Sequence, residues 1–405
     1  MLSLAAKLGG REMLGEYALA VALTAPVAML AHLNLRAVLA TDVGGRRAFG
    51  DYLTVRLWVS GAGLAAITVM ALVFGRSWEM SAVIFLTGLS QTSETVSDAY
   101  YGAMQRRDEM DRIARSMMAR GALSAAGFGV ALFLSKDLVW AVAAAAAGRL
   151  LVLTAYDRRV GSAGESMEGT GWTGVRGILR QAAPLGAVLM LVSLNTNLPR
   201  YAIERMMGVA ELGAFAAVAS FVTAGSTIVN ALGQAATPRL AGHASRREPT
   251  QFLGLAAKLG GLVFGLGLAG VAGSALLGKV VLTIAYRAEY AAFSGLLVGV
   301  MAAAIPGYLA AALGYVVTAA RAFDAQVPML CLAAVASGWV SWYLVPRMGL
   351  GGAALAMAAS AVVQISGQAL ILRRAMRRQA AAAVVQIGGQ TLILLRAMRR
   401  LEAAA

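Results

Sequence analysis

The sequence predicts an all-α, polytopic membrane protein with about eleven transmembrane helices. The 405 residues are 59% hydrophobic and only 14% charged, with a mean hydropathy of +0.70, whereas soluble domains are about 45–50% apolar. The apolar residues also fall into repeated runs of about 20, the length at which a helix crosses the ~30 Å hydrocarbon core. Such continuous runs exclude a transmembrane β-barrel, whose shorter strands alternate every second residue.

Residues 1–156 are predicted to form a first lobe of about five spans. Residues 1–16 are short and mixed, with charges at Lys7, Arg11, Glu12 and Glu16, so the first span is placed after them. A charged connector at residues 105–115 separates the third span from the fourth. The predicted spans are Tyr17–Ala40, Tyr52–Phe74, Trp78–Met104, Ser116–Leu134 and Leu138–Tyr156.

Residues 157–180, rich in Gly, Ser and Arg, are the longest break between apolar runs and are predicted to be a linker. Residues 181–376 are predicted to form a second lobe of six spans. These spans are Gln181–Met206, Leu212–Ala236, Phe252–Leu277, Ala292–Ala320, Val327–Val345 and Leu350–Leu372. Gly is abundant, with 46 residues, because small residues let helices approach closely in lipid.

The Arg-rich tail at residues 377–405 contains a duplication. Ala361–Arg378 recurs as Ala383–Arg400 with three differences. The second copy offers only about 17 apolar residues, the lower limit for a span. If this second copy crossed the membrane, its arginines would lie on the outer side, against the positive-inside rule. We therefore expect either a helix lying at the membrane interface or a duplication without function.

The basic residues orient the chain. Connectors on the linker side carry fourteen arginines, against eight Lys or Arg on the opposite side. The positive-inside rule thus places the linker and the C-terminus in the cytoplasm. Because the +15 net charge is explained by topology and no aromatic-interleaved basic surface occurs, we expect no nucleic-acid partner.

The sequence predicts neither an enzyme nor a cofactor site. No G-x-S-x-G, H-E-x-x-H or Walker motif is present. Cys331 is a single thiol in an apolar run, which rules out a disulfide framework. His32 and His243 lie too far apart in sequence to have metal-ligand spacing.

One long apolar run is interrupted by Asn195, Asn197, Pro199, Arg200 and Glu204. Polar residues inside a span line something polar by default, and Pro199 leaves the carbonyl of Asn195 without its helical partner. A broken helix with polar groups facing a cavity is a common form of transporter substrate site. The alternative is an Arg200–Glu204 pair, four residues apart, that neutralises itself near the outer surface.

The third span carries a second polar stripe, Glu94, Asp98, Tyr101 and Gln105, on one helix face. Two carboxylates four residues apart in a low-dielectric setting can share a proton, which suits gating or proton coupling. The favoured alternative is a structural network with nearby arginines. The candidates for that network are Arg106, Arg112 and Arg120.

Arginines also recur near the linker-side ends of first-lobe spans, at Arg36, Arg56, Arg120 and Arg149. Each could extend its charge to the interface. Together they could line a cationic vestibule for an anion such as a pyrophosphate, because the guanidinium fork matches phosphate geometry.

These segments resemble the Wzx-type oligosaccharide (O-antigen) flippases of the multidrug/oligosaccharidyl-lipid/polysaccharide exporter superfamily. The resemblance covers most of the chain in the family's order. It is carried by LNLRAVLATD at residues 33–42, ETVSDAYYGAMQRRDEMDRIARS at 94–116, SLNTNLPRYAIERMMGVAELGAF at 193–215, STIVNALGQAATPRLA at 226–241, LGYVVTAARAFDAQVPML at 313–330 and VPRMGLGGAALAMAASAVVQ at 345–364.

The resemblance implies two helical lobes around a central cavity and alternating access. It implies an ion- or potential-driven carrier, working without ATP hydrolysis, in the cytoplasmic (inner) membrane. This carrier moves undecaprenyl-diphosphate-linked oligosaccharide from the cytoplasmic to the outer leaflet for O-antigen or lipopolysaccharide biosynthesis. Expected partners are this lipid-linked oligosaccharide, the lipid bilayer and a polysaccharide polymerase. The start, AKLGGREMLGEYALA, resembles the loop after the family's first helix, so that helix is expected to be missing.

Substrate binding is then expected at Arg200, Arg36, Arg120, Arg149, Asn195 and Asn197, and gating or proton coupling at Glu94, Asp98 and Glu204. Alternatives are a drug exporter of the same superfamily and a degenerate, non-transporting paralogue. A membrane glycan polymerase or ligase usually needs a large outward loop. The longest loop here is predicted to be cytoplasmic, which disfavours that alternative.

Overall fold

The computed structural model describes residues 1–40, 48–169, 171–246, 248–320 and 326–374, and within them the chain is helical without strands. Ten described helical segments are long and apolar enough to cross a membrane. Helix α4 (Trp78–Arg106) is also long enough, at about 43 Å, but is more polar. The all-α, polytopic prediction with about eleven spans is therefore confirmed. The tail at residues 377–405 lies outside the described residues.

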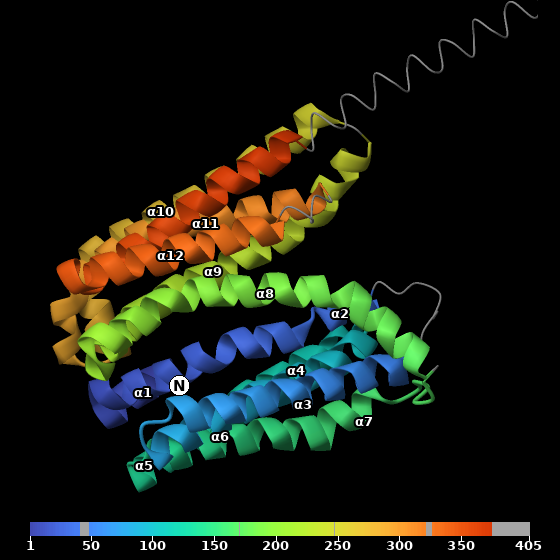
Figure 1. Cartoon of the computed structure of the whole chain (residues 1–405), viewed down its shortest axis with the longest axis horizontal. Coiled ribbons are helices and arrows are strands. Elements are labelled where there is room, and N and C mark those ends of the chain that lie inside the picture. The colour runs from blue at the N-terminus through green and yellow to red at the C-terminus, as the bar shows by residue number, and fades with distance from the viewer. Residues whose placement is uncertain (41–47, 170, 247, 321–325, 375–405) are drawn as a thin grey trace, which may run out of the picture.

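The first lobe contains the helices up to α7 (Figure 1). Ser77 begins α4 by accepting a hydrogen bond from the Met80 amide at 3.2 Å, and Asp137 begins α6 by accepting one from Val139 at 2.7 Å, as helix N-caps do. The elements are α1 (Leu2–His32), α2 (Leu35–Ala40), α3 (Phe49–Phe74), α4, α5 (Met110–Ser135), α6 (Leu138–Val152), the π-helical turn η1 (Leu153–Asp157) and α7 (Arg158–Gly161).

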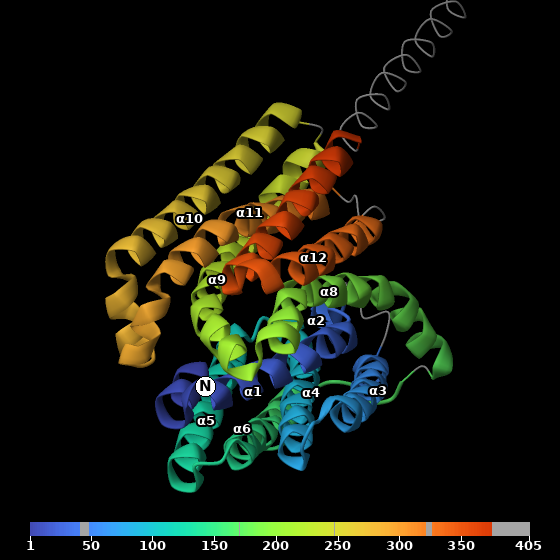
Figure 2. The ribbon, with the colours of Figure 1, turned by 60° about the vertical axis from the view of Figure 1, so that its left-hand side comes forward.

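The second lobe packs beside the first and holds the remaining helices (Figures 1 and 2). These are α8 (Trp172–Met207), α9 (Val209–Ser245), α10 (Pro249–Ala285), the 3-10 segment η2 (Ala288–Phe293), α11 (Ser294–Ala319), α12 (Gln326–Met348) and a last helix at Leu350–Arg374. We call the end of the bundle near residues 157–171 the linker end. The opposite end, with the turns at residues 75–77 and at Gly208, is the far end.

Helix α1 joins the two lobes by packing against α8 and α9 as well as α3 and α4. Glycines make this close approach possible. A Cβ on Gly15 would lie 1.9 Å from the Val209 carbonyl oxygen, and one on Gly213 would lie 2.1 Å from that of Arg11. Near the far end, one hydrophobic core runs continuously from the first lobe into α9 and α11. The lobes are therefore most tightly joined where they share this core.

Helix α1 begins earlier than the predicted span at Tyr17, because residues 2–16 are helical on both sides of a kink at Gly10, whose φ is positive, and extend α1 along α9. The predicted first span also ends differently. Leu33 and Asn34 have positive φ and separate α1 from α2, a conformation that Asn tolerates better than most residues. The predicted linker is shorter than 157–180, since η1 and α7 continue α6 to Gly161 and α8 begins at Trp172.

All six tryptophans have side chains at least 62% exposed, on the outside of the bundle. Trp78 and Trp140 lie in the first turns of α4 and α6 at the far end, whereas Trp172 begins α8 at the linker end. Tryptophan favours the two membrane–water interfaces. This placement therefore agrees with helices that span a bilayer between the two ends.

Candidate functional site

The first lobe encloses a cavity of about 390 Å³ between α1, α4, α5 and α6. Its wall on α4 is polar because that helix places Thr87, Gln91, Glu94 and Asp98 on one face. Glu94 lies 12 residues before the end of α4 at Arg106, about 18 Å from the linker end at 1.5 Å per residue. The cavity therefore lies within the span and not at its edge.

Glu94 bridges two arginines from two other helices. Its Oε1 lies 3.3 Å from Nη2 of Arg120 on α5, and its Oε2 lies 3.0 Å from Nη1 of Arg149 on α6. Nη1 of Arg120 and Nε of Arg149 are buried without a hydrogen-bond partner. Arg120 also lies over the ring of Tyr101, at 5.6 Å from its centroid. The sequence pattern placed these residues near one another, but the bridge depends on how the three helices pack.

Asp98, one turn closer to the linker end, is the centre of a second cluster. Its carboxylate lies 3.2 Å from Nε2 of His32 and 3.8 Å from both Arg36 and Arg56. Arg56 is fully buried, and its Nη1 donates to the Ala31 carbonyl at 3.0 Å. Arg36 continues the network by donating from Nε to Gln105 at 2.8 Å.

The charges of this site do not cancel. Arg36, Arg56, Arg120 and Arg149 contribute four positive charges, while Glu94, Asp98 and the neighbouring Asp157 contribute three negative ones, so the formal sum is +1 with His32 neutral. The Asp157 carboxylate accepts a hydrogen bond from Ser116. We call Arg36, Arg120, Arg149 and Glu94 the anion site, because they line the cavity.

A second cavity, of about 490 Å³, lies between the lobes and is lined by Arg200 of α8 and by Ser220 and Thr223 of α9. Both cavities are lined by Tyr17 and Val21, so they adjoin along α1. Arg200 donates to Oδ1 of Asn197 at 2.8 Å. Among the described residues, no carboxylate lies within ion-pair distance of Arg200. The neutralising Arg200–Glu204 pair considered from the sequence is therefore wrong.

Glu204 instead pairs with Arg76 in the turn between α3 and α4, at 2.7 Å. This ion pair ties the end of α8 to the first lobe at the far end. The expected break at Pro199 is also wrong, because α8 runs through both Pro184 and Pro199 without interruption. Packing on α1 and α12 supports a continuous, though curved, helix past the hydrogen bond that Pro199 cannot make (Figure 2).

The predicted binding residue Asn195 lies inside the second lobe and away from both cavities. Its Nδ2 donates to the carbonyls of Leu191 and Leu330, and its Oδ1 accepts from Ser360. Asn197 touches the interlobe cavity only through Arg200. The structure therefore brings together Arg36, Arg120, Arg149, Glu94 and Asp98, and leaves Arg200 in the adjoining cavity.

Four site residues were missed from the sequence: His32, Arg76, Thr87 and Gln91. Thr87 and Gln91 precede Glu94 by seven and three residues, so extending the helical stripe of Glu94 and Asp98 backwards would have found them. His32 and Arg76 gave no such signal, because their partners lie on other helices.

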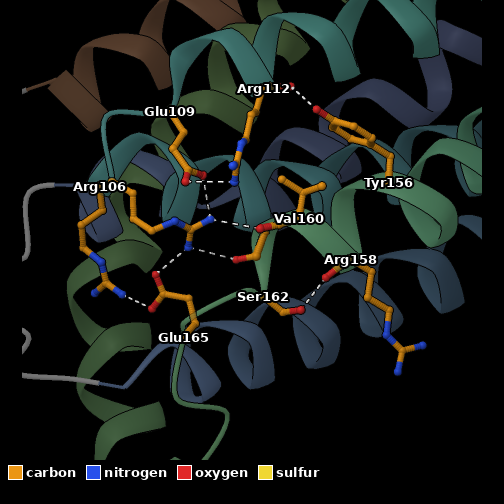
Figure 3. A network of polar contacts seen from close by, with 10 residues as sticks. Arg106, Glu109, Arg112, Tyr156, Arg158, Val160, Ser162 and Glu165 are labelled. Atoms are coloured by element: carbon orange, nitrogen blue, oxygen red, sulfur yellow. Dashed lines mark hydrogen bonds and ion pairs between the residues drawn. The ribbon is translucent and has the colours of Figure 1, made fainter.

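A polar network at the linker end fixes the linker to the first lobe (Figure 3). Arg107 donates to Glu165 and Glu109 at 3.0 Å and to the carbonyls of Val160 and Gly161 at 3.1 and 3.3 Å. Arg106 makes a further ion pair with Glu165. Arg106 and Arg112 are therefore partners of Glu165 and Glu109, not of the α4 stripe.

We expect Arg107→Ala to release the linker, because four contacts to it and to Glu109 are lost together. Limited trypsin digestion should then cleave after the exposed Arg158 and Arg159 on the order of tenfold faster, given about 1.5–3 kcal/mol per charged hydrogen bond. Arg112→Ala is the matched control. It removes an arginine whose side chain contacts Glu109 alone, and equal cleavage in both variants would contradict the anchoring role.

This arrangement of membrane-length helices in two lobes is a transporter fold, and solved structures share it. An inward-facing multidrug resistance MATE family transporter of the MOP superfamily superimposes with a TM-score of 0.73 at 14% identity, covering 93% of this chain and 94% of that one. The lipid II flippase MurJ, in an inward closed conformation, gives 0.69 at 9% identity, covering 95% and 87%.

Sequence comparison adds the polysaccharide connection. Residues 64–242 match the model of the family described as "Polysaccharide biosynthesis protein". The capsular polysaccharide biosynthesis protein CapF of Staphylococcus aureus is 22% identical over 362 residues, which cover 89% of this chain and 90% of that protein. These findings support a polysaccharide-exporter type of protein and confirm the resemblance drawn from the motifs. The solved structures that share the fold of this chain are transporters and flippases rather than enzymes.

Proposed function

We propose that this protein flips a lipid-linked oligosaccharide, joined through a diphosphate to a polyprenyl carrier, from the cytoplasmic to the outer leaflet. The observation that carries the proposal is the net positive anion site within the span. An unbalanced positive cluster inside a membrane is costly unless it serves an anion. A diphosphate diester supplies two compensating negative charges, and guanidinium groups match its oxygens.

In this proposal the polyprenyl tail stays in the bilayer while the diphosphate is held by Arg36, Arg120 and Arg149. Thr87 and Gln91 lie further along α4 toward the far end, with buried oxygens Oγ1 and Oε1 that lack hydrogen-bond partners. Uncharged polar groups of this kind suit sugar hydroxyls. The first sugar, bonded directly to the distal phosphate, would lie near Gln91, about 4.5 Å along α4 from Glu94, and the next sugar near Thr87, about 10 Å along it.

Arg200 extends the path into the interlobe cavity, because its cavity adjoins the anion site along α1. Alternating access would require the lobes to separate at the far end, where Arg76 and Glu204 join them. The positive-inside rule supports placing the linker end and the C-terminus in the cytoplasm of a cell with this protein in its inner membrane. The surface polysaccharide served would be a capsule or an O-antigen, in concert with a polymerase.

Deleting the gene in its native host should abolish one surface polysaccharide and cause its lipid-linked precursor to accumulate. Restoring the gene with Arg200→Ala should return on the order of a tenth of the wild-type polysaccharide, because a charged contact of about 1.5 kcal/mol is lost. Extraction of lipid-linked oligosaccharide and surface glycan staining measure both. Full restoration by the Arg200→Ala gene would exclude Arg200 from the path.

The MATE-like fold raises drug export as a second function. The net positive cavity argues against the cationic dyes typical of drug exporters, since like charge repels them. Dye accumulation in the same deletion strain separates the two functions. A drug exporter would leave surface polysaccharide unchanged and raise dye accumulation on deletion, whereas our proposal predicts the reverse.

A further inference from the structure

Glu94 occupies the position in the anion site where an incoming anion would bind. Its side chain is 48% exposed and projects from α4 into the cavity, whereas the side chains of Arg120 and Arg149 are only 10% and 21% exposed. Among the described residues, Glu94 is the only carboxylate within ion-pair distance of either arginine. Glu94 is thus the most exposed member of the bridge, and the two arginines are its buried walls.

The bridge has the geometry of an anion complex. Each carboxylate oxygen faces a guanidinium on a different helix, at 3.3 and 3.0 Å. Two oxygens of a phosphate group can be held in the same way, because guanidinium donors bind carboxylate and phosphate alike. A diphosphate offers more acceptor oxygens than a carboxylate. It could therefore also reach the donors left unpaired, Nη1 of Arg120 and Nε of Arg149.

Asp98, one turn away, is held differently. Its side chain is only 13% exposed, and it lies beside the fully buried Arg56. Displacing Asp98 would leave Arg56 as an uncompensated buried charge, which is strongly unfavourable. Displacing the half-exposed Glu94 frees Arg120 and Arg149, which line the cavity and can be paired by the incoming anion, whereas Arg56 does not line it. Of the two carboxylates, only Glu94 is placed to exchange with a ligand.

We propose that Glu94 is a resident competitor for the substrate diphosphate. This inference rests on the proposed function. Without substrate, Glu94 fills the fork of Arg120 and Arg149. The diphosphate displaces Glu94 on binding, and Glu94 recaptures the arginines when the substrate leaves. Competition of this kind weakens binding but speeds release, which a carrier needs because a tightly held substrate is not delivered.

Glu94→Gln tests this role, because the amide keeps the side chain's shape but removes its charge. The purified full-length protein is titrated with inorganic pyrophosphate and with a short-chain prenyl diphosphate, by calorimetry in lipid nanodiscs. The variant is expected to bind both probes about tenfold more tightly than wild type, and to flip a diphosphate-linked glycolipid in proteoliposomes about tenfold more slowly. Tight binding together with slow turnover is the signature of a lost competitor.

Two further variants make the test decisive. Asp111→Asn removes one negative charge from an exposed pair on α5 outside the cavity, and should leave affinity unchanged, which excludes a general charge effect. Glu94→Asp withdraws the carboxylate by one methylene so that it cannot reach both arginines. It should tighten binding by a smaller factor, and it serves in place of Glu94→Gln if that variant does not fold.

The outcomes separate the two claims. Unchanged or weaker diphosphate binding by folded Glu94→Gln or Glu94→Asp, with wild type binding and flipping normally, would overturn the competitor role and leave the flippase function standing. Wild-type protein that neither binds a diphosphate probe nor flips the glycolipid would remove the proposed function itself.

Discussion

Replacing Arg120 and Arg149 together by Gln is expected to reduce flipping of a diphosphate-linked glycolipid by at least about 100-fold. The two side chains supply the guanidinium fork around Glu94. Charged hydrogen bonds contribute roughly 1.5–3 kcal/mol each, and losing two of them costs about 3 kcal/mol or more, which is on the order of 100-fold. Initial flipping rates in proteoliposomes, at matched protein density, measure the loss.

The matched control is Arg115→Gln on the same helix as Arg120. Arg115 is 71% exposed and pairs with Asp111 on the surface, outside the cavity. The Arg115→Gln variant should flip the glycolipid at the wild-type rate, which would show that losing an arginine from α5 does not by itself reduce flipping. A double variant of Arg120 and Arg149 that is folded and flips within threefold of wild type would show that the anion site does not hold the substrate.

The second large effect is on stability. Asp98→Asn is expected to lower the free energy of unfolding by about 3 kcal/mol, because it leaves Arg56 buried and unpaired. Combining it with Arg56→Met should recover most of this loss, since a buried ion pair can be replaced by apolar groups at little cost. Denaturation in detergent, followed by tryptophan fluorescence, gives the free energy of unfolding for the wild type, the two single variants and the double variant, which completes the double-mutant cycle.

Asp111→Asn provides the reference value for this cycle. It removes a carboxylate from an ion pair that is exposed on both sides, so the change should stay within about 1 kcal/mol. If Asp98→Asn were as mild as Asp111→Asn, the cluster around Asp98 would not be a structural support. Its role as a candidate for proton coupling would then regain weight over the structural one.

The fold was largely readable from the sequence because bilayer thickness fixes the length of an apolar run. Helix α4 is the instructive case. It was predicted as a span, although within the described residues it is the one membrane-length helix that falls short of a spanning hydropathy. Its polar residues lower the mean hydropathy of the helix. A span tolerates them here because they face the cavity and not the lipid. The polar face of α4 therefore makes the helix harder to recognise as a membrane span, and it also marks the functional site.

The site was only partly readable, because ion pairs across helices depend on the packing of the lobes. The α4 stripe and the first-lobe arginines were recognised from periodicity, but the partner of each was not. Arg76 and Glu204 are 128 residues apart and meet only where the two lobes join. The predicted break at Pro199 failed for a related reason, since neighbouring helices support a continuous α8 there.

The central claim is that the positive charge of the first-lobe cavity is matched to a diphosphate. The most direct test compares two glycolipids with the same sugar and the same prenyl tail, one linked by a diphosphate and the other by a monophosphate, in proteoliposomes containing the wild-type protein. We expect the diphosphate lipid to be flipped at least tenfold faster, from a difference of about 1.4 kcal/mol or more for one further charged contact. Equal rates for the two lipids would contradict the claim.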